Sequence, residues 1–92
     1  MTVAPSDGKE VEITLKAVLV DVLGLPEARV TAFDESSPLF GALPEFDSMA
    51  VAGLLTELEE RLGIVIEDDE VDADMLETFG SLLTFARNKA LQ

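Results

Sequence analysis

The chain has 92 residues, 48% of them hydrophobic, enough for one small domain with a core but too few for a deep enzyme cleft. It contains no cysteine and no histidine, which excludes disulfides, thiolate metal sites and imidazole bases. The formal net charge of −13 at pH 7 disfavours nucleic acid and anionic membranes as partners, and favours basic protein surfaces.

The N-terminal residues show no basic stretch followed by an apolar run, so they do not form a secretory signal. No uninterrupted apolar run approaches the length of a membrane span. We therefore expect a cytoplasmic monomer without a metal site, in which residues 1–92 form one domain and residues 1–6 a disordered tail.

A first helix is predicted over residues 8–23. Asp7 and Glu10 have the spacing of a capping box. Gly24 and Pro26 then end the helix. Its apolar residues repeat at helical spacing: Val11, Leu15, Val18, Leu19, Val22 and Leu23.

A long loop is predicted over residues 24–46, because prolines and glycines recur throughout it. Residues 27–30 have the composition of a short helical turn. A loop this long is uncommon unless it packs or functions, so we expect its apolar residues to plug the ends of the bundle. These residues are Val30, Phe33, Leu39, Phe40, Leu43 and Phe46.

A second main helix is predicted over residues 48–62, with Asp47 as its N-cap and Gly63 just past its end. Its apolar face carries Val51, Leu54, Leu55, Leu58 and Leu62. The run from Ile64 to Ile66 is apolar, but no partner strand is predicted elsewhere. We therefore interpret it as an extended plug.

A short helix is predicted near residues 73–77, capped by Asp72 or Asp74. Thr78 caps a last helix, whose basic residues Arg87 and Lys89 suit the negative end of the helix dipole. Its apolar stripe consists of Phe79, Leu82, Leu83, Ala86 and Ala90. The fold class is therefore all-α, with three main helices, one short helix and a long first loop.

Ser48 is the strongest candidate for a site of covalent modification, since it directly follows an N-cap. Backbone N–H groups are unpaired in the first helical turn and the dipole is positive there, so a phosphodiester on this hydroxyl would be stabilised. No His or Lys adjoins Ser48 in the sequence, so it is not an activated nucleophile of its own. It is better suited to be an acceptor that a partner enzyme modifies.

Over roughly residues 9–90 the chain resembles the acyl carrier proteins. The resemblance rests on a helix ending in VLGLPEARV, a long loop, Asp-Ser-Met, the segment LLTELEERLGIVIEDDEV and a closing TFGSLLTFARNK. It implies an acyl-carrier-like four-helix bundle with 4′-phosphopantetheine on Ser48, whose thiol holds acyl groups as thioesters. Such a protein is not an enzyme, because partner enzymes perform the chemistry.

The resemblance also implies partners, namely a phosphopantetheinyl transferase and acyl-loading and acyl-transferring enzymes with basic surfaces. Asp47 could help to hold the Mg²⁺ of the transferase within the complex. Acids concentrate between Glu45 and Glu77, which favours an electrostatic docking face. The candidate docking residues are Asp47, Met49, Glu57, Glu59 and Glu60.

By the same resemblance, acyl chains would enter an apolar cavity between the helices. The candidate lining residues are Val51, Leu54, Leu55, Leu58, Ile64, Ile66, Leu76 and Phe79. For any single one of them, a place in an ordinary core is the favoured interpretation. A core built mostly from Leu and Val could open at modest cost, which is compatible with a cavity.

Three residues depart from the family pattern around the serine. Pro44 and Glu45 stand where a Leu-Gly pair is usual, and Met49 replaces a leucine of similar bulk. These changes favour a dedicated carrier of a specialised pathway over the housekeeping carrier of fatty-acid synthesis. An aminoacyl or peptidyl carrier and an unmodified interaction module remain open alternatives.

A calcium-binding loop is excluded by the spacing around the alternating acids that start at Asp68. Counting from Asp68 places Ala73 and Phe79 at the loop positions where an EF-hand needs Gly and Glu.

Overall fold

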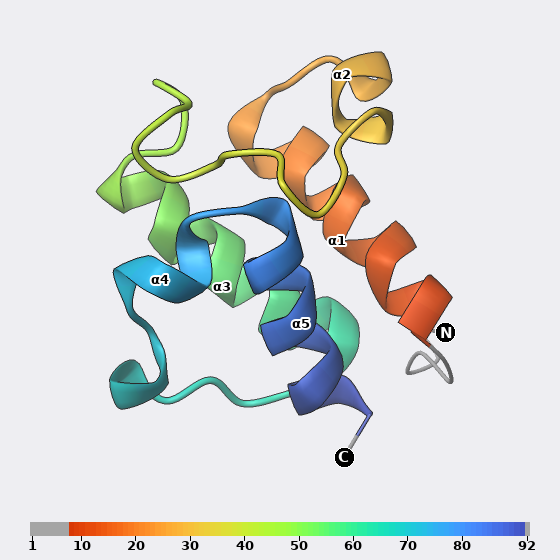
Figure 1. Ribbon diagram of the computed structural model, residues 1–92. Helices are drawn as coiled ribbons and strands as arrows, with labels where there is room; N and C mark the ends of the chain where they lie inside the picture. The colour runs from red at the N-terminus through yellow and green to blue at the C-terminus, as the bar shows by residue number, and fades with distance from the viewer. Residues whose placement is uncertain (1–7, 92) are drawn as a thin grey trace.

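The computed structural model describes residues 8–91 as an all-helical bundle (Figure 1). Its elements are α1 (Gly8–Leu23), α2 (Glu27–Thr31), α3 (Ser48–Leu62), the 3₁₀ helix η1 (Asp68–Glu70), α4 (Ala73–Leu76) and α5 (Phe79–Ala90). Helix α1 packs against α3, α5 and α2, and α4 packs against α5. The predicted fold class and the boundaries of the first two main helices are confirmed. The predicted tail and Asp7 lie outside the described residues.

The helix ends follow the local sequence. Gly24 and Gly63 adopt φ angles of 67° and 66°, in the left-handed region that disfavours other residues. Asp72, rather than Asp74, caps α4 by accepting the N–H of Met75 at 2.8 Å. Thr78 caps α5 in a reciprocal capping box with Ser81. These caps explain where α4 and α5 begin and where α1 and α3 end.

The core lies between the three long helices and the first loop. Buried side chains come from one face of each helix and from Leu25, Val30, Leu39, Leu43 and Phe46 of the 24–47 region. No charged side chain within residues 8–91 is buried. The prediction for Phe40 is wrong: its side chain is 38% exposed, and its ring and that of Phe46 pack edge to face.

The long loop is joined to the start of α5 by backbone hydrogen bonds. Leu39 and Phe40 donate to the carbonyls of Glu77 and Leu76, at 2.8 and 3.1 Å. In return, Phe79 and Gly80 donate to the carbonyls of Ser37 and Glu35, at 2.8 and 3.0 Å. The first N–H groups of α5 are thereby satisfied by a segment some forty residues earlier.

Gly80 is the residue that lets these two segments approach. A Cβ atom at this position would lie 2.6 Å from the Glu35 carbonyl oxygen. We expect Gly80→Ala to lower the free energy of unfolding by about 1–3 kcal/mol, because backbone must move to make room. Urea unfolding measures this. Gly53→Ala is the matched control: its Cβ would lie 3.4 Å from Val22, and alanine favours the helix interior. Equal stability of both variants would contradict the close approach.

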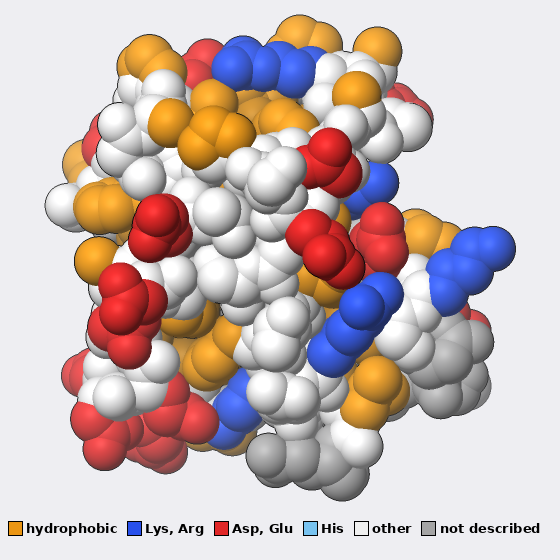
Figure 2. Space-filling model, in the orientation of Figure 1, with side chains coloured by type: hydrophobic (Ala, Val, Ile, Leu, Met, Phe, Trp, Pro, Cys, Tyr) orange, Lys and Arg blue, Asp and Glu red, His pale blue; other side chains and the backbone are white. Residues whose placement is uncertain are grey.

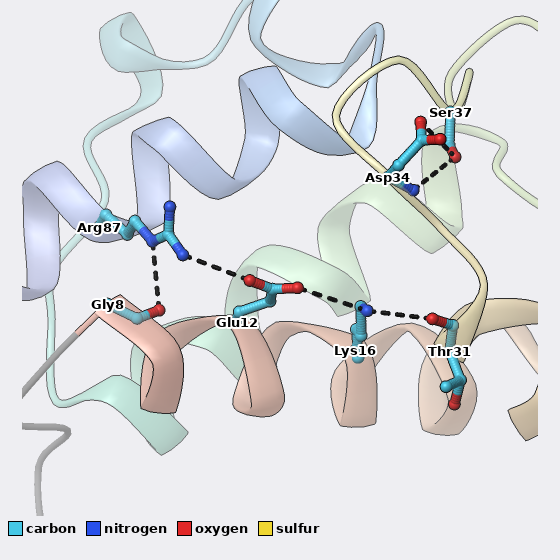
Figure 3. Close-up of polar contacts among 7 residues, drawn as sticks. All are labelled: Gly8, Glu12, Lys16, Thr31, Asp34, Ser37 and Arg87. Atoms are coloured by element: carbon cyan, nitrogen blue, oxygen red, sulfur yellow. Dashed lines mark hydrogen bonds and ion pairs between the residues drawn. The ribbon is translucent and has the colours of Figure 1, made fainter.

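Polar contacts along the outer side of α1 connect three helices (Figure 3). Glu12 lies between Arg87 and Lys16, at 3.3 and 3.4 Å from their nitrogens. Arg87 also donates to the Gly8 carbonyl, and Lys16 donates to the Thr31 carbonyl. The side chains of these pairs are partly exposed, so each pair contributes about 1 kcal/mol or less to stability.

Candidate functional site

Ser48 is the first residue of α3 and its side chain is exposed. The Asp47 carboxylate accepts the N–H of Ala50 at 2.9 Å, and the Asp47 carbonyl accepts the N–H of Val51 at 2.9 Å. The Ser48 hydroxyl makes no hydrogen bond to any residue in the described part of the chain. It therefore stands free at the positive end of a helix of 15 residues.

Two surface hollows meet at Ser48. The larger one, of about 470 Å³, runs along α3 past Val51 and Leu55, with residues 66–71 on its other side. The smaller one, of about 290 Å³, lies towards Phe40 and Leu76. A phosphorylated arm on Ser48 fits this arrangement, because the helix end suits its phosphate and the hollows offer apolar surface to the rest of the arm.

The eight candidate cavity residues separate into two groups. Val51, Leu55, Ile66 and Leu76 border the hollows at Ser48. Leu54, Leu58 and Phe79 are at most 1% exposed and belong to the packed core, while Ile64 is half-buried and borders neither hollow. A cavity that takes up an acyl chain stays a prediction.

Sequence reasoning missed several residues that line the hollows: Phe40, Ala52, Thr56, Asp68 and Val71. The signal for Ala52 and Thr56 was available, because they lie four and eight residues after Ser48 and so share its face of α3. No local pattern places the other three there.

The candidate docking residues differ in how free their side chains are. Met49 is 85% exposed, and the exposed Glu60 makes no polar contact within residues 8–91. Glu57 instead accepts from Arg61 at 3.0 Å, and Glu59 accepts the N–H of Ile66 at 2.7 Å. Glu57 and Glu59 therefore have structural partners as well as a place on α3.

Arg61 lies among these acids and bridges two helices. It donates to Asp21 of α1 at 2.7 Å and to Glu57 at 3.0 Å. The hydrogen bond to Asp21 is the main cause that raises the pKa of Arg61 above its usual value. Arg61 thereby neutralises part of the acidity on this side of α3.

Asp47 has a capping role that can be separated from its charge. We expect Asp47→Ala to lower the free energy of unfolding by about 1 kcal/mol, because the N–H of Ala50 loses its acceptor. Asp47→Asn should keep most of this stability, since the amide oxygen also caps. Urea unfolding of both variants measures the difference. If both lost the same amount, the cap would not be the cause.

Acidic side chains also gather around η1, where Asp68 lines the larger hollow at Ser48. Figure 2 shows them at the lower left, where η1 lies in Figure 1, and Glu67, Asp68 and Asp69 are exposed there. No group of three potential metal-ligating side chains occurs within the described residues. No helix of the described chain is long and apolar enough to cross a membrane.

Comparison with known proteins agrees with this geometry. Residues 14–86 match the family model described as a phosphopantetheine attachment site. The fold is similar to the solution NMR structure of holo acyl carrier protein NE2163 from Nitrosomonas europaea, with a TM-score of 0.76 and 40% sequence identity. The match covers 87% of this chain and 94% of that one. The chain therefore belongs to the acyl carrier protein family, whose members are carriers with covalently bound phosphopantetheine rather than catalysts.

Proposed function

We propose that Ser48 is the residue that bears the 4′-phosphopantetheine arm and that the chain itself performs no catalysis. The observation that carries the proposal is the free, exposed Ser48 hydroxyl at the N-terminus of α3, beside two hollows. When bound, the arm supplies the thiol that holds the acyl group as a thioester.

Loading requires a partner enzyme, because no Lys or His adjoins Ser48 in the sequence. The Ser48 oxygen forms the new P–O bond, the diphosphate bond of coenzyme A breaks, and adenosine bisphosphate leaves. The hydroxyl proton passes to a base of the transferase. Asp47 is adjacent and exposed, so within that complex it can contribute a carboxylate to Mg²⁺ alongside phosphate oxygens.

The experiment that tests this proposal is the intact mass of the protein after incubation with coenzyme A, Mg²⁺ and a broad-specificity phosphopantetheinyl transferase. We expect a gain of one arm, located by peptide mapping to the peptide that contains Ser48. A folded protein that gains no mass, and that also lacks the arm when isolated from its native cells, would favour an unmodified interaction module. A gain on any other residue would refute the site.

We further propose that the acidic side of α3 docks basic partner enzymes. Affinity for the transferase should then fall as ionic strength rises, because exposed charges are screened beyond about 10 Å at 0.1 M salt. Glu60→Gln should weaken binding at low salt, since its carboxylate is exposed and free. Glu27→Gln on α2 is the matched control and should bind as the wild type does. Affinity that does not depend on salt would contradict an electrostatic docking face.

A further inference from the structure

Residues 64–71 form one side of the larger hollow at Ser48, and we call them the wall segment. Ile66, Asp68 and Val71 of this segment face residues of α3 across the hollow. Ile66 and Val71 are only partly buried, and Val65 is 68% exposed. The wall segment therefore has a small apolar contact with the rest of the molecule.

The backbone adds little to hold this segment in place. Within residues 8–91, its one backbone–backbone hydrogen bond to another element is from the N–H of Ile64 to the Glu59 carbonyl, at 3.1 Å. The bonds donated by Glu70 and Val71 stay inside the segment. Segments with few apolar contacts and few outside hydrogen bonds open locally at low free energy.

Two side-chain contacts add to this single backbone hydrogen bond and connect the wall segment to α3 and α5. Glu59 of α3 accepts the N–H of Ile66 at 2.7 Å, and Lys89 of α5 donates to Glu70 at 2.9 and 3.0 Å. The Lys89 and Glu70 side chains are 20% and 31% exposed, so water screens this pair less than a fully exposed one. The N–H of Glu67, and then Lys89, hold the pKa of Glu70 below its usual value, which keeps the carboxylate charged.

We propose that Glu59 and Lys89 are positioning residues that hold the wall segment against α3, and that this closure shields the acyl thioester carried from Ser48. The proposal rests on the proposed function of Ser48. One contact fastens the segment near its start and the other near its end, to two different helices. Because the segment has few other contacts, it opens as one unit, and loss of either contact raises the population in which both Ile66 and Val71 have left α3.

The first test needs no arm and uses amide hydrogen exchange of the unmodified protein. Lys89→Gln should speed exchange of the Ile66 N–H, which Lys89 does not contact, by roughly two- to five-fold. Glu59→Ala, which removes the acceptor oxygen, should similarly speed exchange at Glu70 and Val71, which Glu59 does not contact. Effects confined to the amides next to each substitution would overturn the idea of a segment held at two points.

Arg87→Gln is the matched control, because it removes a partly exposed ion pair of the same helix α5 on the side that faces α1 (Figure 3). It should leave exchange in the wall segment unchanged. A charge-reversed pair, Glu70→Lys with Lys89→Glu, should bring exchange at Ile66 back towards the wild-type rate. An equal acceleration in Arg87→Gln would mean that only global stability had changed.

The second test uses protein loaded with an octanoyl thioester and measures the rate of thioester cleavage by hydroxylamine. Cleavage should be roughly two- to five-fold faster in Lys89→Gln and Glu59→Ala than in wild type and Arg87→Gln. Equal cleavage in all four proteins would overturn the proposed shielding. If no variant gains the arm by intact mass, the assignment of Ser48 fails instead, while the exchange data still decide whether the segment is held.

Discussion

Replacing Ser48 by alanine is expected to abolish transfer of the phosphopantetheine arm completely while leaving the fold intact. In the proposed function the hydroxyl oxygen of Ser48 is the acceptor, and alanine has no oxygen to form the phosphodiester. The Ser48 side chain is exposed and makes no hydrogen bond within residues 8–91, so the free energy of unfolding should change by no more than about 0.5 kcal/mol. Intact mass after incubation with coenzyme A, Mg²⁺ and transferase measures the loss, and circular dichroism confirms the helices.

Ser36→Ala is the matched control for this experiment. Ser36 is also exposed and also lies near an aspartate, since its hydroxyl donates to Asp34 at 2.8 Å, but it sits in a loop instead of a helix N-terminus. It should load as the wild type does. Mass gained by Ser48→Ala, or lost by Ser36→Ala, would show that the free helix end is not what selects the serine.

The parts of the fold that the sequence predicts are those with local causes. Asp47 and Thr78 cap helices by bonding to N–H groups three residues ahead, at 2.9 and 3.1 Å. Gly63 ends α3 because its φ angle suits glycine. Such interactions involve residues close together in the chain, so the spacing of residue types reveals them.

The parts that the sequence does not predict join residues far apart in the chain. Gly80 donates to the Glu35 carbonyl, and Lys89 forms an ion pair with Glu70. Neither contact produces a repeating pattern of residue types in the sequence. The 3₁₀ helix η1 was also missed, although Glu67 and Glu70 form a capping box there. A run of acids gives no clear helical signal, and a helix of three residues has no apolar face to mark it.

The candidate site was predictable to the same degree. Adjacent residues are enough to predict Ser48 and Asp47 as site residues, and the structure leaves the Ser48 hydroxyl free. Which apolar residues of α3 border a hollow and which fill the core depends on where residues 66–71 and Phe40 lie. That placement is a tertiary property, so the helical stripe alone could not separate Val51 from Leu54.

Phe79→Ala is expected to cause the largest loss of stability, because Phe79 is 1% exposed and is the largest fully buried side chain. Its ring lies 6.0 Å from that of Phe33, and the Lys16 ammonium lies 5.5 Å from its centroid. Truncation of such a residue costs about 3–5 kcal/mol, against a total of roughly 5–10 kcal/mol for a small domain. Urea unfolding should therefore show a variant that is barely folded.

Val51→Ala distinguishes a core residue from a residue that borders the hollow. Val51 is half-buried and lies beside Ser48, so its truncation should cost about 1 kcal/mol or less and leave a folded protein. A small loss for Phe79→Ala, similar to that for Val51→Ala, would mean that the Phe79 ring borders open space. Phe79 would then belong with the residues that could receive an acyl chain. A large loss would place it in the packed core, and the entry of an acyl chain would have to begin between Val51 and the wall segment.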